Sequence, residues 1–569
     1  MLTTPRVFPV LLLSAAACSP QPPAQAPIPT PVAPVAAAVH RTEPAITARD
    51  LRARLFAYAD DSMMGREAGT LGNVRATDYL AAELRRLGVE PAGENGTYFQ
   101  TVPMIQSAVD TTVTVAVGDS ILTRWKDYAP IPNLGGFLPY GMRRSLDGVQ
   151  VVFGGRLGDT TQVLTPEQAR GRLVVIAPPA APINAMAALG ALPGRYPDAA
   201  GVAIGILDFI PPADQGFLRE PREGLGGDLP DGPLGMFVTL RTLGLLLGAP
   251  LESATLGAAG RTLRGSPRFA AQPLAYPARN VVGVVPGRDS LLRLQYVALG
   301  AHNDHVGPSG RPVDHDSVWA FNHVVRPLGA ESPSRTPTAD EAARIRTILD
   351  SLRALRPARP DSIYNGADDD GSGSVTLLEL AEAFARAPEK PRRSILFVWH
   401  TAEEKGLDGA QHFTDNPTVP REAIVAALNM DMVGRGDTGD LPDGGPGYLQ
   451  LIGSRRLSTE LGDLVERVNQ RANYGFTFDY TFDADGHPQN YYCRSDHYMY
   501  ARYGIPIVFF TTGSHQDYHQ LTDEPQYIAY DKMARVGRFV MDLARTVADL
   551  DHRVVVDKPK PDPTAPCRQ

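Results

Sequence analysis

The pattern of apolar and polar positions changes twice along the chain, and each change predicts a different kind of structure. Residues 48–60 and 72–88 show helical periodicity, with three leucines of ATDYLAAELRRLG on one face. After about residue 105 the apolar runs become short and are separated by Gly and Pro, as in GVQVVFGG and GRLVVIAPP, which predicts strands. From about residue 276 onward, strand-like runs such as LQYVALGAH and RSILFVWHTAEE alternate with helical segments.

This succession predicts two kinds of domain. Alternating strands and helices are typical of an α/β domain with a mostly parallel central sheet. The strand-rich segment between its two parts predicts an inserted small β-rich domain. The expected organisation is an α/β domain formed by residues 41–105 and 271–555, a β-rich insert at 106–270, and a flexible tail at 556–569.

Length and composition fit a folded chain with more than one core. The chain has 569 residues, of which 43% are apolar and 21% are charged. Its net charge of −8 argues against nucleic acid or an anionic membrane surface as a partner. Cys493 and Cys567 are the cysteines beyond the N-terminal region; two are too few for a disulfide framework, and their pairing is left open.

The N-terminal segment has the features of an export signal. Arg6 precedes a short apolar run at residues 7–13, and small residues then lead into Cys18. This is typical of a bacterial lipoprotein signal at residues 1–18 with lipidation of Cys18; ordinary secretion with cleavage just before that cysteine is the alternative. The Pro- and Ala-rich residues 19–40 predict an extended tether. We therefore expect an exported protein of the bacterial cell envelope, periplasmic or on the outer membrane, or a secreted one.

Polar side chains follow several of the predicted strands. His302 ends the strand YVALGA, Glu403 and Glu404 follow ILFVWHTA, and Asp431 follows VAALNM. The carboxyl ends of parallel strands meet at one edge of a sheet, where ligands bind. Two further segments carry the same residue types: GADDDGSG contains Asp368, Asp369 and Asp370, and QDYHQLTDEP contains His519 and Asp523.

These residue types favour a metal site when they occur together. Any single segment is better explained by a structural or surface residue than by a metal ligand. Carboxylates at the ends of apolar strands are costly to bury unless they are paired or bind metal, and several of them with two histidines favour a divalent cation. Zinc is the first choice for this set of ligand types.

In this order the segments resemble the di-zinc aminopeptidases and related exopeptidases of metallopeptidase family twenty-eight (clan MH). The resemblance also covers NVVGVVPG, RSDHYMYARYGIPIVFF and the N-terminal DDSMMGREAGTLGNVRATDYLAAELRRLG. It implies the three-layer αβα fold of zinc exopeptidases, which is phosphorylase/hydrolase-like. The segments ARGRLVVIAPP and DAAGVAIGILDF of the insert resemble a protease-associated (PA) domain, which would restrict access to the site, bind substrate, or have no direct function.

The resemblance implies two Zn²⁺ ions and assigns their ligands by position. His302 and Asp431 would bind one ion, Glu404 and His519 the other, and Asp369 would bridge them. Two zinc ions about 3.5–4 Å apart activate a shared water and stabilise the oxyanion that its attack produces.

The resemblance also assigns supporting roles. Glu403 would be the general base, Asp304 would orient His302, and Tyr492 would stabilise the oxyanion. Arg494 would contact substrate or be structural. Further supporting polar residues are Asp370, Asp496, His497 and Asp523.

The segment at residues 305–365 departs from the compact family pattern. It is longer than most loops, and ADEAARIRTILDSLRAL within it predicts a helix. We interpret it as a lid insert. Its histidines, His315 and His323, either approach the site or are ordinary structural residues.

The expected function is removal of N-terminal residues from peptide substrates. A carboxypeptidase or dipeptidase of the same fold is the enzymatic alternative and would need a cationic side chain, such as Arg494, to hold a carboxylate. An inactive binding module tethered to the envelope is the alternative of a different class. Nucleic acid is not an expected partner, a lipid on Cys18 is the expected link to a membrane, and the sequence does not indicate an oligomeric state.

Overall fold

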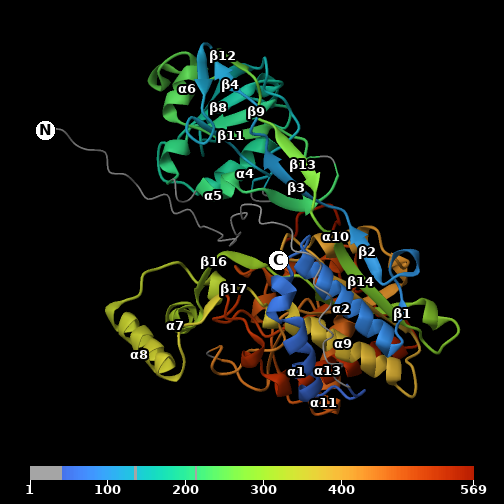
Figure 1. Ribbon diagram of the computed structural model, residues 1–569. Helices are drawn as coiled ribbons and strands as arrows, with labels where there is room; N and C mark the ends of the chain where they lie inside the picture. Colours follow the sequence, from blue (N-terminus) through green and yellow to red (C-terminus); the bar gives the residue numbers. More distant parts are fainter. Residues whose placement is uncertain (1–41, 134–137, 212–214, 228, 442) are drawn as a thin grey trace. The chain divides into compact units, whose positions relative to one another are not determined.

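The computed structural model describes residues 42–569 except 134–137, 212–214, 228 and 442. The expected signal peptide, the tether and Cys18 lie outside the described residues. The described chain forms two compact units (Figure 1). A β-rich unit spans Ile105–Pro273, close to the expected boundaries at 106 and 270, and an α/β unit combines residues 42–104 with Leu274–Gln569.

The α/β unit is built on one large sheet, as the strand–helix alternation predicts. In spatial order the strands are β1 (Glu90–Pro91), β14 (Ala278–Val285), β18 (Ser394–His400), β15 (Tyr296–His302), β19 (Ile424–Met430), β22 (Ile507–Thr511), β20 (Tyr448–Ile452) and β21 (Thr477–Asp479), with β2 (Phe99–Val102) also on β14. The central strands β18, β15, β19 and β22 are parallel to one another, whereas β14, β1, β2 and β20 each pair antiparallel with their neighbour. The sheet is therefore mixed, with its parallel part in the middle.

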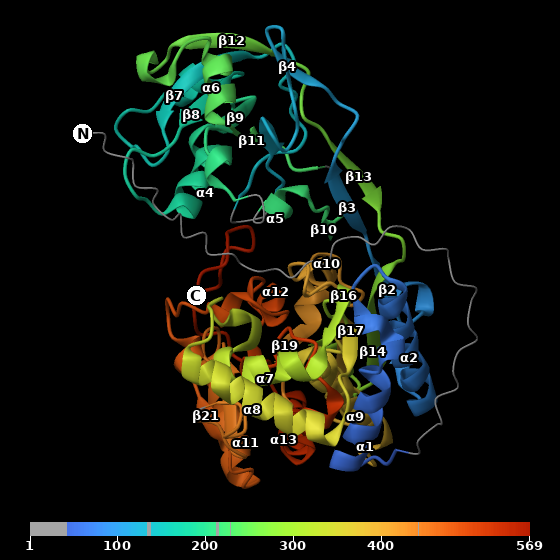
Figure 2. The same ribbon diagram turned by 60° about the vertical axis from the view of Figure 1, so that its left-hand side comes forward.

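Helices cover both faces of this sheet, because alternate residues of each strand are apolar on both sides. Val297 and Leu299 of β15 pack into one core and Ala298 into the other. One face carries α1 (Ala48–Tyr58), α2 (Leu71–Leu87), α9 (Gly373–Arg386), α11 (Thr459–Arg471) and α13 (Tyr530–Asp549); the other face carries α10 (Asp408–Asp415) and α12 (His497–Ala501). Figures 1 and 2 show the five helices of the first face lying together along one side of the sheet.

The segment interpreted as a lid has its own small fold within the α/β unit. Strands β16 (Pro308–Asp314) and β17 (Pro360–Ile363) pair antiparallel at its base, and α7 (His315–Val325) packs against α8 (Ala339–Leu355) between them. Helix α8 is the predicted one, and Thr338 and Glu341 form a capping box at its start. We call residues 306–364 the insert from here on.

The β-rich unit contains more α/β character than its sequence predicts. Strands β7, β8, β9 and β11 are parallel neighbours, and α6 packs on them. Its resemblance to a PA domain stays a prediction. The elements of the larger sheet, in spatial order, are β5 (Ser120–Leu122), β4 (Val115–Val117), β12 (Ala259–Arg264), β7 (Gln150–Arg156), β8 (Leu173–Ala177), β9 (Gly201–Ile204), β11 (Leu234–Val238) and β6 (Tyr128–Pro130). A smaller sheet contains β10 (Arg222–Leu225), β3 (Met104–Val109) and β13 (Phe269–Pro273), and the helices are α3 (Pro166–Ala169), α4 (Ala185–Arg195), α5 (Gly216–Arg219) and α6 (Leu240–Leu247).

The expectation of a flexible tail at residues 556–569 is wrong. A disulfide joins Cys567 to Cys493, with their Cα atoms 5.8 Å apart. The side chain of Gln569 accepts a hydrogen bond from the backbone N–H of Tyr492 at 3.1 Å and donates one to the carbonyl of Phe482 at 2.5 Å. A Pro-rich composition suggests a segment without a core, but here a covalent bond and side-chain hydrogen bonds fix the segment instead.

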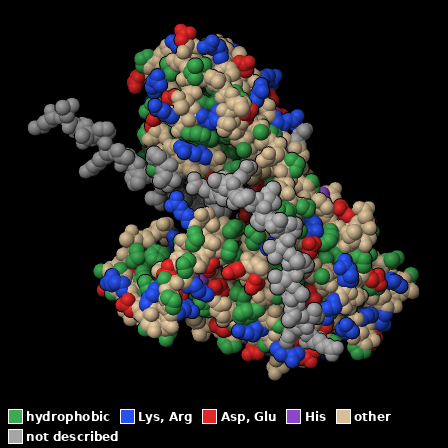
Figure 3. Space-filling view, in the orientation of Figure 1, with side chains coloured by type: hydrophobic (Ala, Val, Ile, Leu, Met, Phe, Trp, Pro, Cys, Tyr) green, Lys and Arg blue, Asp and Glu red, His purple; other side chains and the backbone are tan. Residues whose placement is uncertain are grey.

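The face of the molecule seen in Figure 3 carries charged side chains of both signs. On the face in Figure 3, Lys and Arg side chains are interspersed with Asp and Glu, and no continuous basic area is visible. Among the residues that the structure describes, no helix is both long enough and apolar enough to cross a bilayer.

A buried arginine ties the first helix of the α/β unit to α9. Arg54 of α1 donates to Glu379 at 2.5 Å and to Glu382 at 2.6 Å, both on α9, and to Glu83 of α2 at 2.6 Å. Its side chain is 2% exposed. Burial raises the pKa of Glu379 to about 7 in spite of this pairing, so the carboxylate depends on the guanidinium.

We expect Arg54→Ala to lower the free energy of unfolding by about 3–5 kcal/mol, because it leaves buried carboxylates without a partner. Urea unfolding followed by tryptophan fluorescence measures this change. Arg49→Ala, in the same helix with a side chain 62% exposed, is the matched control and should cost less than about 1 kcal/mol. Equal effects of the two substitutions would contradict the structural role of Arg54.

Candidate active site

The polar residues predicted at strand ends meet at one edge of the central sheet. His302 is the last residue of β15, and its neighbours in the sheet, β18 and β19, lead into Glu403–Glu404 and into Asp431. Asp369 lies in the helical turn η8 (Ala367–Ser372) that precedes α9. His519 comes from the loop between β22 and α13.

The carboxylate of Asp369 lies between two histidines. Its Oδ1 is 3.1 Å from His302 Nε2, and its Oδ2 is 2.9 Å from His519 Nε2. Burial raises the pKa of Asp369, but its contacts with both imidazoles outweigh burial, and the pKa lies well below the usual value. One oxygen therefore faces each histidine, which is the arrangement a bridging ligand needs.

Two groups of ligand atoms share this aspartate. The first contains His302, Asp369 and Asp431, with Asp431 Oδ1 3.5 Å from His302 Nε2. The second contains Asp369, Glu404 and His519, with Glu404 Oε2 3.0 Å from His519 Nε2, and His305 joins it. Burial lowers the pKa values of His302 and His519, but the carboxylates around them raise both well above the usual value. Such an excess of buried carboxylate fits divalent cations, with zinc preferred by the mixture of His, Asp and Glu.

A pocket opens beside these groups. It is lined by Asp369, the aspartate common to both groups, and by Glu403, Tyr491, Arg494, Ser514 and Tyr518. Burial, with the nearby Asp431 and Glu404, raises the pKa of Glu403 well above its usual value, even though His302 opposes this shift. Burial also raises the pKa of Tyr518, so its phenol keeps its proton.

Comparison with known proteins agrees with this geometry. Residues 280–544, which contain the whole ligand set, match the model of peptidase family M28.

Most of the α/β unit is therefore similar to peptidase family M28.

Individual relatives are more distant or cover less of the chain. Leucine aminopeptidase 1 of Penicillium rubens is 28% identical over 194 residues, which are 32% of this chain and 47% of that protein; the match thus spans about half of the curated relative. Among solved structures, an aminopeptidase from Aneurinibacillus sp. strain AM-1 is 16% identical and covers 91% of this chain and 97% of its own, with a TM-score of 0.44. BSAP, a zinc aminopeptidase from Bacillus subtilis, is 15% identical, covers 90% and 97%, and has a TM-score of 0.42.

Asp304, which the sequence analysis expected to orient His302 through its carboxylate, approaches the ring more closely through its backbone carbonyl. His302 Nδ1 lies 3.1 Å from the backbone carbonyl of Asp304 and 3.8 Å from the nearer carboxylate oxygen. That oxygen instead accepts the backbone N–H of Glu403 at 3.1 Å. The residue was placed correctly, but a sequence does not distinguish its carbonyl from its carboxylate.

Asp370 holds three backbone segments together beneath the site. Its carboxylate accepts the N–H groups of His302 at 3.0 Å, Gly373 at 2.9 Å and Met432 at 3.2 Å. The close approach requires glycine at position 373, because a Cβ there would lie 2.3 Å from Asp370 Oδ1 and 2.4 Å from the carbonyl of Met430. The glycine of the GSG turn thus lets the aspartate loop reach the ends of β15 and β19.

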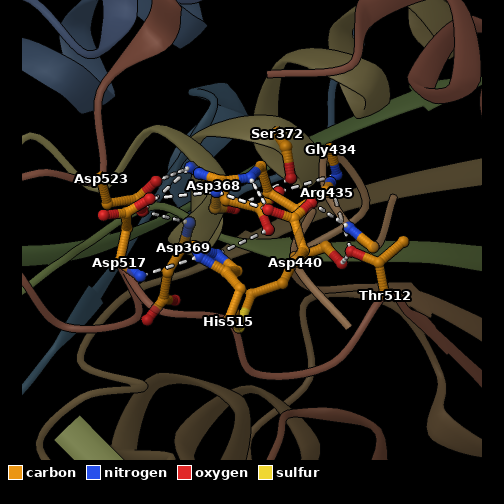
Figure 4. A network of polar contacts seen from close by, with 12 residues as sticks. Asp368, Asp369, Ser372, Gly434, Arg435, Asp440, Thr512, His515, Asp517 and Asp523 are labelled. Atoms are coloured by element: carbon orange, nitrogen blue, oxygen red, sulfur yellow. Dashed lines mark hydrogen bonds and ion pairs between the residues drawn. The ribbon is translucent and has the colours of Figure 1, made fainter. Parts of the chain in front are cut away.

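Asp523 and Asp368 hold the bridging residue from the other side. The carboxylate of Asp523 accepts the N–H groups of Asp368 at 3.0 Å and of Asp369 at 3.1 Å. Asp368 in turn accepts the N–H of Gly434 at 2.7 Å and faces Nε2 of His515 at 3.2 Å (Figure 4). The backbone that carries Asp369 is therefore fixed by a network of buried polar side chains.

The outer end of that network depends on one buried arginine. Asp517 donates its backbone N–H to His515 Nδ1 at 3.2 Å and accepts from Arg435 at 3.0 Å. Arg435 also donates to Asp440 at 2.7 Å, as Figure 4 shows. The sequence analysis did not single out these residues, although His515 and Asp517 lie close to His519 in the chain, and Arg435 lies close to Asp431.

Asp431 and Glu404 each have one carboxylate oxygen in contact with a neighbouring side chain. Ser495 Oγ donates to Asp431 Oδ2 at 2.7 Å, so Asp431 Oδ1 is left facing His302. His305 Nδ1 lies 2.8 Å from Glu404 Oε1, leaving Oε2 toward His519. The sequence analysis assigned no role to Ser495 or His305. Their places in the chain could have indicated one, because Ser495 precedes Asp496 and His305 ends the segment GAHNDH that contains His302.

The remaining predicted residues divide into near and far. Tyr492 packs on Arg456, 4.4 Å from its ring, and does not line the pocket; Tyr491 and Tyr518 do. Asp496 is fully buried beside the site with no hydrogen-bond partner for its carboxylate among the described residues, and burial raises its pKa well above the usual value.

The neighbour of Asp496 does not reach the ligands. The ring of His497 stacks on Phe509 at 4.6 Å, and burial lowers the pKa of this histidine to about 3. It is therefore a neutral packing residue at ordinary pH.

We expect Gly373→Ala to destabilise the α/β unit by about 1–3 kcal/mol, because the new methyl group must displace Asp370 or the end of β19. Thermal unfolding measures the effect. Gly439→Ala, where a Cβ would meet nothing within 4 Å, is the matched control and should change stability by less than about 0.5 kcal/mol. If Gly373→Ala were as stable as the control, the packing of the start of α9 against Asp370 and the end of β19 would be misassigned.

Proposed function

We propose that the protein is a zinc-dependent aminopeptidase that binds two Zn²⁺ ions and removes N-terminal residues from peptides. The observation that carries this proposal is the position of Asp369, with one carboxylate oxygen in each of two ligand groups. His, Asp and Glu side chains in this mixture suit zinc, and both groups leave a side open to the pocket. The match to family M28 supports the same activity.

The side chains around the pocket supply the proton transfers. Bound zinc provides Lewis acidity and lowers the pKa of water. Glu403 lines the pocket, and its raised pKa suits a carboxylate that accepts the proton of the attacking water and delivers it to the leaving amine. Tyr518, a neutral phenol on the pocket wall, donates a hydrogen bond to the oxyanion in place of the predicted Tyr492.

The charges of the pocket support action at the amino end. A carboxypeptidase needs a cation that is free to bind the terminal carboxylate of its substrate. Arg494 lines the pocket, but its guanidinium is ion-paired with Glu331.

An inactive binding module is not supported by the residues at the site. Such a protein has no need for a complete ligand set, whereas this chain retains both metal-ligand groups and Glu403 beside them. The completeness of the set favours catalysis.

We also propose that the protein is exported and anchored by a lipid on Cys18. The signal-like N-terminal residues motivate this proposal. The disulfide between Cys493 and Cys567 supports it, since such bonds persist in oxidising compartments. Labelling of the protein with a radioactive fatty acid, lost in Cys18→Ala, tests it; secretion without label would support the alternative.

We expect zinc-loaded protein to cleave peptides with a free amino end and to leave their N-acetylated forms intact. Glu403→Gln should retain both zinc ions and lower kcat by about 10²–10⁴-fold, because it removes the general base and keeps the ligands. Peptide cleavage followed by mass spectrometry, with metal content by atomic emission, measures both effects. Glu389→Gln, a carboxylate exposed at the surface, is the control and should keep full activity.

Three results would contradict this account in different ways. Cleavage from the carboxyl end regardless of acetylation would assign a carboxypeptidase. Cleavage unaffected by Glu403→Gln would remove this residue from the mechanism. Zinc binding without cleavage of either set would favour the binding module.

A further inference from the structure

The insert reaches the wall of the active-site pocket at one point. Its short helical turn η7 (Gly329–Glu331) lies against the loop that carries His519. The N–H of Ala330 donates to the carbonyl of Tyr518 at 3.0 Å. Gly329 packs so closely that a Cβ there would lie 2.4 Å from the same carbonyl, and its φ of +54° favours glycine. This contact fixes where the next residue, Glu331, points.

The carboxylate of Glu331 is held by two residues of the pocket wall. Its Oε1 accepts from Arg494 Nη1, and its Oε2 accepts from Ser514 Oγ at 2.9 Å. The Glu331 side chain is 12% exposed and that of Arg494 is 38% exposed, so the pair is partly shielded from solvent. Ser514 Oγ is also 2.9 Å from the hydroxyl of Tyr491, which places the carboxylate at the centre of a polar group shared by the insert and the pocket.

This ion pair involves the side chain of the pocket that is best suited to bind an anion. Apart from the ligand His519, Arg494 is the cationic side chain among the described residues that line the pocket. Arg494 also donates to the hydroxyl of Tyr518 at 3.4 Å and lies 5.2 Å from the ring of Tyr491, so the guanidinium is oriented over the pocket wall. An arginine in this position without a partner would bind a carboxylate by charge-assisted hydrogen bonds.

We propose that Glu331 is a specificity-determining residue, which occupies Arg494 and so prevents the site from recognising the free carboxylate of a short peptide. The substrate class that follows is peptides recognised by their amino end, with no preference for a free carboxylate close to the scissile bond. This inference rests on the proposed aminopeptidase function. It assigns to the insert a role in substrate choice, because the residue that neutralises the pocket arginine comes from the insert.

The exclusion of carboxylates is an expected consequence of charge. A substrate carboxylate that approached Arg494 would have to compete with Glu331 and would be repelled by it. Replacing the carboxylate of Glu331 by an amide of the same shape, in Glu331→Gln, keeps a hydrogen-bond partner for Ser514 while removing the negative charge. Discrimination against a substrate is commonly built from such a repulsive element.

The test compares Leu-Gly, which ends in a carboxylate, with Leu-Gly amide, which does not. For the wild-type protein we expect kcat/KM for Leu-Gly to exceed that for Leu-Gly amide by no more than about twofold. In Glu331→Gln the ratio should shift toward Leu-Gly by about fivefold or more, and in Glu331→Gln/Arg494→Gln it should return to the wild-type value. Glu341→Gln is the matched control: it neutralises a carboxylate of the same insert that pairs with Arg335, and it should leave the ratio unchanged.

A purely structural role for Glu331 would lower both activities and leave their ratio unmoved, and that result would overturn the proposal. A preference of more than about fivefold for Leu-Gly in the wild-type protein would overturn it as well, and this measurement does not depend on the folding of any variant. Hydrolysis of neither peptide by the wild-type protein would contradict the aminopeptidase function itself, and the inference would fall with it. Hydrolysis of Leu-Gly amide with an unchanged ratio in Glu331→Gln would contradict only the role of Glu331.

Discussion

The carboxylate of Asp369 is the group on which the rest of this site depends. Its two oxygens face two imidazoles, and buried carboxylates converge on the same point, an arrangement that is costly unless cations occupy it. The parallel centre of the sheet brings His302 and Asp431 to one edge, and η8 brings the bridging residue between them. The networks of Asp370 and Asp523 then fix this loop through its backbone N–H groups.

The pocket around this centre is assembled from segments that are distant in sequence. The disulfide of Cys493 lies next to Arg494 in the chain, and the hydrogen bonds of Gln569 fix the same stretch. The insert contributes Glu331 from the other side. The chemistry therefore resides at the strand ends, whereas the selection of substrate depends on the loops and the insert that surround them, as is common in proteins whose sites are carried by a rigid sheet.

The ligand positions could be predicted from the sequence because strands that are apolar throughout end in polar residues, and parallel strands end at the same edge. The resemblance to the family placed Asp370 and Asp523 near the site. It failed for Tyr492, since a tyrosine near a site in sequence can point into the core, and for the tail, whose composition does not reveal that Cys567 pairs. The role of Glu331 could not be foreseen, because an ion pair across 163 positions leaves no local pattern.

The most direct test of this account is the location of metal in crystals of the zinc-loaded protein, measured by anomalous scattering at the zinc edge. We predict two peaks about 3.5–4 Å apart, one beside His302 and Asp431 and the other beside Glu404 and His519, with the carboxylate of Asp369 between them. A single peak, or two peaks that Asp369 does not bridge, would contradict the central claim.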